Sequence, residues 1–168
     1  MNGVKVNKNV DVEEVSRLAL RLGLLIEEWF AEMCREFGIT LTQAAALRCL
    51  SENGPCRQSQ LADYLNCDAS NVTAVADRLE NLGAIRRNVS TTDRRVKLLE
   101  LTTEGANLVA NLWQRSRLTS PVAVLSLEER STLATLVSKM IEATGASMAI
   151  RHISEGDPAT FALDESSR

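Results

Sequence analysis

The chain has 168 residues, a formal net charge of −3 and 45% hydrophobic residues, which is a composition typical of one globular domain. No apolar run reaches the roughly 20 residues that a membrane-spanning helix needs, and the first residues lack a signal-peptide core, so we expect a cytoplasmic protein with no membrane partner. Four scattered cysteines and one histidine predict neither a disulfide framework nor a clustered zinc site, and we expect no metal and no other cofactor.

A long amphipathic helix is expected over residues 10–37. Its apolar residues recur at steps of three and four, as in a helical stripe: Val12, Val15, Leu18, Leu22, Leu25, Trp29, Met33 and Phe37. A helix of this length spans about 40 Å at 1.5 Å per residue. Because a small domain needs less than that to cover its own core, we expect this helix to pair with a second copy of the chain.

Three shorter helices are expected next, at about 42–53, 58–65 and 69–82. Gly54-Pro55 ends the first of them, and the turn Asn66-Cys67-Asp68 separates the other two. The apolar residues expected to face the core are Leu61, Ala62 and Leu65 in the second helix and Val72, Val75, Leu79 and Leu82 in the third.

After Gly83 the pattern changes from helical to extended. Residues 84–89 and 96–101 are expected to form two strands of a hairpin, with a polar, charged tip between them. A helix capped by Thr102 follows, and a last helix is expected from about 127 to 150. The inward residues of that last helix are expected to be Leu133, Leu136, Val137, Met140 and Ile141, and residues 152–168 are expected to be poorly ordered.

The order short helix, turn, helix, hairpin is that of a winged helix-turn-helix, in which the second helix enters the major groove of DNA. The exposed face of helix 69–82 is expected to present Ser70, Asn71, Thr73, Ala74, Asp77 and Arg78. Hydroxyl and amide groups of this kind can donate and accept hydrogen bonds at base edges. The alternative is that Ser70 and Asn71 only cap the helix.

The hairpin concentrates positive charge although the whole chain is acidic. Between positions 86 and 97 there are five basic residues and one acid, namely Arg86, Arg87, Arg94, Arg95 and Lys97 with Asp93. Local charge, not net charge, decides whether a surface attracts phosphates. We expect Arg86 and Arg87 to face the other cations across the hairpin, an arrangement that is unfavourable without a neutralising partner. The minor groove of DNA is such a partner, and a solvated surface hairpin is the alternative.

Residues 41–105 resemble the winged helix-turn-helix of the MarR (multiple antibiotic resistance regulator) family. The matching stretches are Leu61-Ala62, Ser70-Asn71-Val72-Thr73, Asp77-Arg78-Leu79-Glu80, Leu82-Gly83, Asp93-Arg94-Arg95 and Leu101-Thr102-Thr103-Glu104-Gly105. The resemblance implies a single, mainly α domain with a small β hairpin. In it, residues 41–101 form a DNA-binding lobe, while 10–37 and 103–150 form the interface of a homodimer.

The resemblance also implies roles for individual residues. Arg95 would enter the minor groove, with Asp93 orienting its guanidinium through a charge-assisted hydrogen bond. Ser70, Asn71, Thr73 and Arg78 would recognise the major groove or bind phosphate. Gln58 and Ser59, at the start of the shorter helix, would contact the DNA backbone. Arg57 stands where many relatives have a Ser or Thr cap, and a phosphate contact would be its use instead.

Family members commonly respond to small aromatic acids, other lipophilic compounds or oxidants. The candidate walls of an effector pocket are Trp29, Met33, Leu47 and Trp113, with core or dimer-interface residues as the alternative interpretation. Oxidant-sensing relatives use a cysteine near the start of the first helix, where this chain has none. Cys56 lies in a predicted turn beside Arg57, so it would be the candidate for a thiol-based redox response.

These patterns together predict a ligand-responsive repressor that binds duplex DNA as a homodimer. The alternatives are a winged helix used only for protein contacts and a redox-sensing regulator. An enzyme is not expected, because the chain supplies neither a nucleophile with a base nor paired acids in a predicted pocket.

Overall fold

The computed structural model describes residues 11–89 and 96–143. Within them the chain is mainly helical with one hairpin, as expected. The elements are α1 (Val12–Glu36), α2 (Leu41–Asn53), α3 (Gln58–Leu65), α4 (Ala69–Asn81), β1 (Ile85–Val89), β2 (Lys97–Leu101), α5 (Thr103–Thr119), the 3-10 helix η1 (Pro121–Val124) and α6 (Leu127–Ala143). The short helix η1 was not predicted. The expected continuation of α6 to 150 and the tail 152–168 lie outside the described residues.

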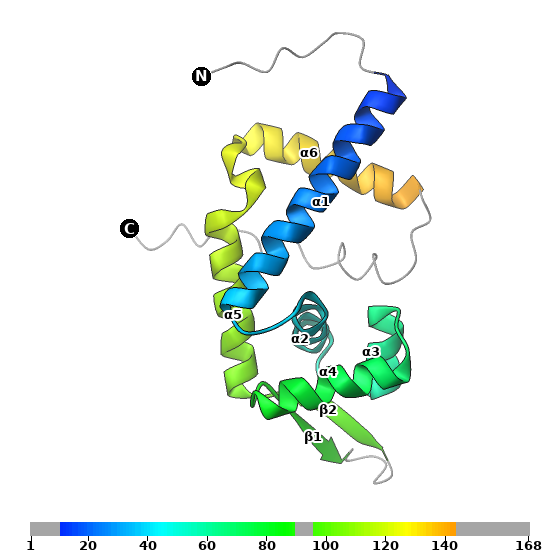
Figure 1. The fold of residues 1–168 in the computed structure, drawn as a ribbon, viewed down its shortest axis with the longest axis vertical. Coiled ribbons are helices and arrows are strands. Elements are labelled where there is room, and N and C mark those ends of the chain that lie inside the picture. Colours follow the sequence, from blue (N-terminus) through cyan, green and yellow to red (C-terminus); the bar gives the residue numbers. More distant parts are fainter. Residues whose placement is uncertain (1–10, 90–95, 144–168) are drawn as a thin grey trace.

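The elements form two regions joined by α5 (Figure 1). Helices α2, α3 and α4 gather with the β1–β2 hairpin at one end of the molecule, while α6 and the first half of α1 lie at the other end. Helix α5 runs between the two regions and contacts α1, α2, β2 and η1. We call the hairpin the wing; it projects from the end that is farthest from α6.

The ends of the helices follow from local hydrogen bonds. Thr40 begins α2 with a capping box, in which its hydroxyl accepts from the Gln43 N–H and the Gln43 side chain accepts from the Thr40 N–H. The predicted start at residue 42 was therefore one residue late. Gly54 ends the helix with a φ of 73°, a conformation that glycine adopts without a steric penalty.

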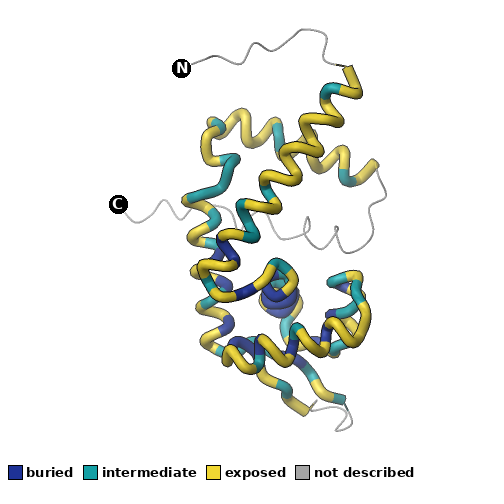
Figure 2. The backbone as a smooth tube through the Cα atoms, viewed as in Figure 1, coloured by how far each residue is buried: buried dark blue, intermediate teal, exposed yellow. Residues whose placement is uncertain are grey.

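The hydrophobic core lies mainly in the region of α2, α3, α4 and the wing, and the end of α1 and part of α5 complete it with Met33, Cys34, Val109 and Leu112 (Figure 2). Leu47, Leu61, Leu79, Ile85 and Leu99 are among its fully buried side chains and come from five different elements. Of the residues expected to face the core on α3 and α4, Ala62, Leu65 and Val75 are half-buried, while Leu82, at the end of α4, is 42% exposed and Ala76 completes the inner stripe instead. The helix ends at Asn81, so Leu82 no longer follows the helical spacing that placed it inward.

The other region exposes much of its apolar surface in a single chain (Figure 2). On α1, the exposed residues include Val12, Val15, Leu18, Leu22 and Leu25. On α6, Leu136, Val137 and Met140 were expected to face inward but are 55%, 41% and 50% exposed. These side chains were placed inward because their helical spacing indicates a buried face, and a single chain offers α6 too little surface to cover that face.

None of the helices in the described residues is both long and apolar enough to cross a membrane.

Candidate nucleic-acid interface

Helices α3 and α4 are joined by a tight turn and held together by buried apolar side chains. Asn66 ends α3 in the left-handed conformation, with φ and ψ of 48° and 49°, which an asparagine tolerates better than most residues. Asp68 then precedes α4 at its N-cap position. Leu61 on α3 and Val72 on α4 are each completely buried. The predicted helix-turn-helix arrangement is therefore present in the fold.

The outer face of α4 is exposed along its length. Every residue that was expected there is exposed: Ser70, Asn71, Thr73, Ala74, Asp77 and Arg78. The Thr73 hydroxyl donates to the Ala69 carbonyl at 2.9 Å and keeps its acceptor lone pairs available. Asp68 occupies the N-cap, so the alternative interpretation of Ser70 and Asn71 as caps is wrong. Neither side chain therefore serves as the N-cap of α4.

The register of the wing corrects the predicted clash of like charges. Arg86 lies opposite Glu100, and Arg87 lies opposite Leu99, so neither arginine faces another cation across the described strands. The Arg86 Nε donates to the Glu100 carboxylate at 3.0 Å. That hydrogen bond raises the pKa of Arg86 and lowers the pKa of Glu100. The charge count missed Glu100 because it stopped at Lys97.

Arg87 connects the wing to α4. Its guanidinium bonds to Asp77 at 2.5 Å and to Glu80, and its side chain is only 23% exposed. The hydrogen bond that Arg87 donates to Asp77 is the main cause of the raised pKa of Arg87. Because both acids lie on α4, these ion pairs fix the orientation of the wing relative to that helix. Arg87 was expected to contact DNA, and its pair with Glu80 was not predicted, although an acid on the preceding helix was a signal for such a pair.

Three cations beside this surface remain without an ion pair to another described residue. They are Arg57 before α3, Arg78 on α4 and Lys97 at the start of β2, and each is exposed. Gln58 and Ser59 begin α3, where Gln58 is half-buried and Ser59 is exposed. The Gln60 side chain accepts from the Arg57 N–H at 2.9 Å, so α3 begins at Gln58 as predicted without a Ser or Thr cap. Asp93, Arg94 and Arg95 lie outside the described residues.

The comparisons with known proteins agree with this geometry. Residues 39–97 match the model of the MarR family. The transcriptional repressor MprA of Escherichia coli K12 is 30% identical over 131 residues, which cover 76% of this chain and 74% of MprA. The chain belongs to the MarR family. The repressor MdtR of Bacillus subtilis is 36% identical over 94 residues, 54% of this chain, and the match spans 61% of MdtR, less than two thirds of its length. The structure of YusO from Bacillus subtilis has a TM-score of 0.63 and 28% identity, and it covers 80% of this chain and 99% of YusO.

The MarR-like motif Leu101-Thr102-Thr103-Glu104-Gly105 joins the wing to α5. The Thr102 hydroxyl accepts from the Gly105 N–H and donates to the Gly83 carbonyl at 2.6 Å, and the Thr102 N–H donates to the Ala84 carbonyl. A Cβ on Gly105 would lie 1.9 Å from the Ala84 carbonyl oxygen, which no real contact permits. Only glycine therefore allows this approach of α5 to the chain segment before β1.

The four candidate effector residues of this MarR-family chain fall into two groups. Met33 and Leu47 are buried in the core, at 3% and 0% exposure, which favours the core interpretation for both. Trp29 and Trp113 are half-buried, and Phe30 contacts both indole rings. The Trp29 Nε1 donates to the Thr119 hydroxyl at 3.3 Å, which ties α1 to α5. These contacts give both indoles a structural role.

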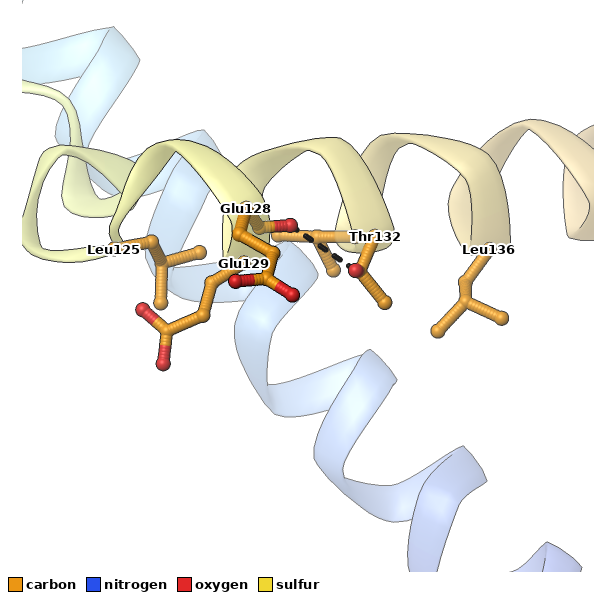
Figure 3. Close-up of a pocket in the computed structure, with 6 residues that line it drawn as sticks. Leu125, Glu128, Glu129, Thr132 and Leu136 are labelled. Atoms are coloured by element: carbon orange, nitrogen blue, oxygen red, sulfur yellow. Dashed lines mark hydrogen bonds between the residues drawn. The ribbon is translucent and has the colours of Figure 1, made fainter.

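An open groove lies on α6, away from the helix-turn-helix (Figure 3). Leu125, Thr132, Leu133 and Leu136 line it, with Glu128 and Glu129 at its rim. Figure 3 shows α1 crossing behind this surface. The groove is continuous with the exposed apolar residues of α6, so it belongs to the surface that a single chain leaves uncovered.

Proposed function

We propose that this MarR-family regulator binds duplex DNA as a homodimer, with α4 in the major groove and the wing beside it. The observation that supports the proposal is the outer face of α4. Its polar side chains are all exposed, and Arg78 makes no ion pair with another described residue. Hydroxyl and amide groups on such a face can donate and accept hydrogen bonds at base edges in the major groove.

The cations around α4 have the placement that phosphate contacts need. Arg57 lies directly before α3 and Lys97 begins β2 of the wing, and both α3 and the wing strand β1 pack against α4. Gln58 and Ser59, in the first turn of α3, would contact the DNA backbone beside Arg57. From their positions in the sequence, Arg94 and Arg95 would lie at the tip of the wing. Asp93 would orient Arg95 for the minor groove. Arg86 would have a weaker role, because Glu100 already neutralises it.

A second copy of the chain is the proposed cover for the apolar surfaces of α1 and α6. Leucine and valine side chains there are exposed over both helices, far beyond the isolated apolar residues of an ordinary monomer surface. Burying them against an identical surface recovers about 25 cal/mol per Å² of apolar area. Two copies related by a two-fold axis would then place their α4 helices in successive major grooves, about 34–36 Å apart.

Repression and response to an effector are the finer parts of the proposal. MdtR and MprA are both named as repressors, which supports the same direction of regulation here. A small aromatic or lipophilic effector would act by favouring one of two separations of the α4 helices. Trp29 and Trp113 are the two candidate residues with exposed surface for such a ligand.

The test begins with selection of bound sites from random duplex DNA, followed by fluorescence anisotropy on the selected sequence. Arg78→Ala should weaken binding by about 1–3 kcal/mol. Arg35→Ala, which removes one exposed charge from α1, is the matched control and should bind as the parent does. Failure to enrich any sequence, together with equally weak binding of random duplex DNA by both variants, would favour the alternative of a winged helix that docks only to proteins.

Arg95 tests the contribution of the wing separately. Arg95→Ala should cost about 1–3 kcal/mol in binding to the selected site, with thermal stability unchanged. Arg95→Lys should restore only part of the affinity, because lysine keeps the charge but lacks the planar guanidinium. Unchanged affinity in Arg95→Ala would remove the wing tip from the proposed complex.

A further inference from the structure

Two of the four cysteines are in contact with each other inside the DNA-binding region. Cys49 lies on α2 and Cys56 lies directly before α3, and both are buried, at 4% and 6% exposure. Their thiols share a hydrogen bond. Within the described residues, Cys34 and Cys67 have no such thiol partner, although Cys34 is buried as deeply.

The surroundings distinguish the two thiols chemically. The hydrogen bond from Cys49 lowers the pKa of Cys56 by more than burial raises it, while the same contact and burial both raise the pKa of Cys49. Cys56 also lies directly before the first turn of α3, and a helix N-terminus stabilises a thiolate. The Asn53 side-chain amide lies 3.9 Å from the Cys49 sulfur. Cys56 is therefore the thiol that ionises first, with Cys49 in place to react with it.

Cys56 is also bonded to the wing. Its N–H donates to the Leu99 carbonyl at 3.1 Å, and the Leu99 N–H donates back to its carbonyl at 2.8 Å. Leu99 lies opposite Arg87 in the hairpin, and Arg87 bonds to the two acids of α4. One row of contacts thus runs from Cys49 through Cys56, Leu99 and Arg87 to α4. A movement of Cys56 changes the position of the wing and of the start of α3 together.

We propose that Cys49 and Cys56 are a dithiol which a hydroperoxide oxidises to an intramolecular disulfide, and that this disulfide weakens DNA binding. The Cys56 thiolate attacks a peroxide oxygen, the O–O bond breaks, and the other oxygen leaves as an alcohol or water. The Cys49 sulfur then displaces the hydroxyl group from the Cys56 sulfenic acid, and that hydroxyl leaves with the Cys49 proton as water. Two thiols and one hydroperoxide give one disulfide, one alcohol and one water.

The disulfide has a structural consequence at the base of the wing. Bonded sulfurs lie about 2.05 Å apart, much closer than two thiols that share a hydrogen bond. Closing that distance draws Cys56 toward α2 and strains its two hydrogen bonds with Leu99. The low exposure of Cys56 restricts the reaction to small oxidants such as hydrogen peroxide.

The disulfide is tested on the full chain by peptide mass spectrometry after hydrogen peroxide treatment and blocking of free thiols. Cleavage after Arg48 and Arg57 leaves both cysteines in one tryptic peptide, residues 49–57. That peptide should lose the mass of two hydrogens and escape blocking, and dithiothreitol should reverse the change. Cys49→Ser and Cys56→Ser should abolish the disulfide, whereas Cys34→Ser and Cys67→Ser are matched controls that should retain it. Free thiols in this peptide, or a disulfide that uses another cysteine, would overturn the proposal.

The effect on DNA binding rests on the proposed function and is measured separately by anisotropy. The oxidised protein should bind the selected duplex about tenfold more weakly than the reduced protein. Cys49→Ser, checked for native helix content by circular dichroism, should bind equally before and after peroxide treatment, and Cys49→Ala repeats the test if serine unfolds the chain. Absence of binding by the reduced protein would refute the proposed function and leave the disulfide result standing. Equal affinity of the oxidised and reduced forms, with the disulfide present, would refute the regulatory effect alone.

Discussion

Replacing Arg87 with alanine separates two explanations of its charge. Arg87 was expected from the sequence to contact DNA, whereas the structure places its guanidinium between Asp77 and Glu80. Ion pairs at a protein surface contribute about 0.2–1 kcal/mol each. Two pairs on a side chain that is 23% exposed therefore give a loss of about 0.4–2 kcal/mol in the free energy of unfolding for Arg87→Ala.

Urea unfolding measures that loss of stability. Fluorescence anisotropy at several salt concentrations measures how the variant binds DNA. If Arg87 only positions the wing, the variant binds DNA more weakly while the dependence of affinity on salt stays the same. If Arg87 contacts a phosphate, the slope of log affinity against log salt becomes shallower by about 0.9 per protomer while stability is unchanged. That second result would refute the positioning role.

Arg86→Ala is the matched control, because it removes the same charge from the neighbouring position. Arg86 has a 57% exposed side chain and bonds only within the wing, to Glu100, so its loss should leave the orientation of the wing on α4 unchanged. A double-mutant cycle with Asp77→Ala isolates the contact between α4 and the wing. Equal and additive losses from Asp77→Ala and Arg87→Ala would mean that the two side chains do not interact in solution.

Three further predictions follow from the same structure. Gly105→Ala should destabilise the fold by about 3 kcal/mol in urea unfolding, since the new Cβ would meet the Ala84 carbonyl oxygen at 1.9 Å; a loss below 1 kcal/mol would contradict the close approach. DNA affinity should fall steeply with salt despite the net charge of −3, with a slope of roughly −5 for three phosphate contacts per protomer in a dimer, and a slope near zero would exclude contact with the backbone. Sedimentation at several concentrations should show a dimer at micromolar protein, and Leu25→Glu should shift it toward monomer with its helix content retained; a parent chain that is monomeric throughout would refute the proposed architecture.

The sequence predicted the order of the elements because each has a local cause. Period-3.6 stripes, glycines at helix ends and the cap at Thr102 act within a few residues, and the boundaries predicted from them that lie in the described residues fell close to the observed ones. The outer face of α4 was also predictable, since it is the complement of a buried stripe. There are two kinds of exception. Leu82 lies beyond the last residue of α4, so the helical stripe no longer predicts its burial. The apolar residues of α6 have a spacing typical of burial, but they lie on a surface that one chain leaves exposed.

The partners of the wing arginines could not be predicted, because they depend on register and on contacts between elements. A shift of one residue in the hairpin would have turned Arg87 away from α4 and placed another side chain opposite Glu100. The number of cations in a segment does not show which of them form ion pairs with acids on another helix. The contact between Cys49 and Cys56 was missed for the same reason: seven residues apart, they meet only because the chain reverses at Gly54 and pairs with β2.

The ion pairs of the wing determine how a regulatory signal would change DNA binding. Arg86 and Arg87, near the base, are neutralised inside the chain, and the second of them fixes the wing on α4. With Leu79, Ile85 and Leu99 fully buried between them, α4 and the wing form one packed unit. A ligand bound among α1, α5 and α6 would therefore act by moving this unit as a whole and changing the distance between the two recognition helices of the proposed dimer. Oxidation of Cys49 and Cys56 would act differently, because it alters the contacts inside the unit, and so it would weaken binding even to a single half-site, where the distance between recognition helices has no influence.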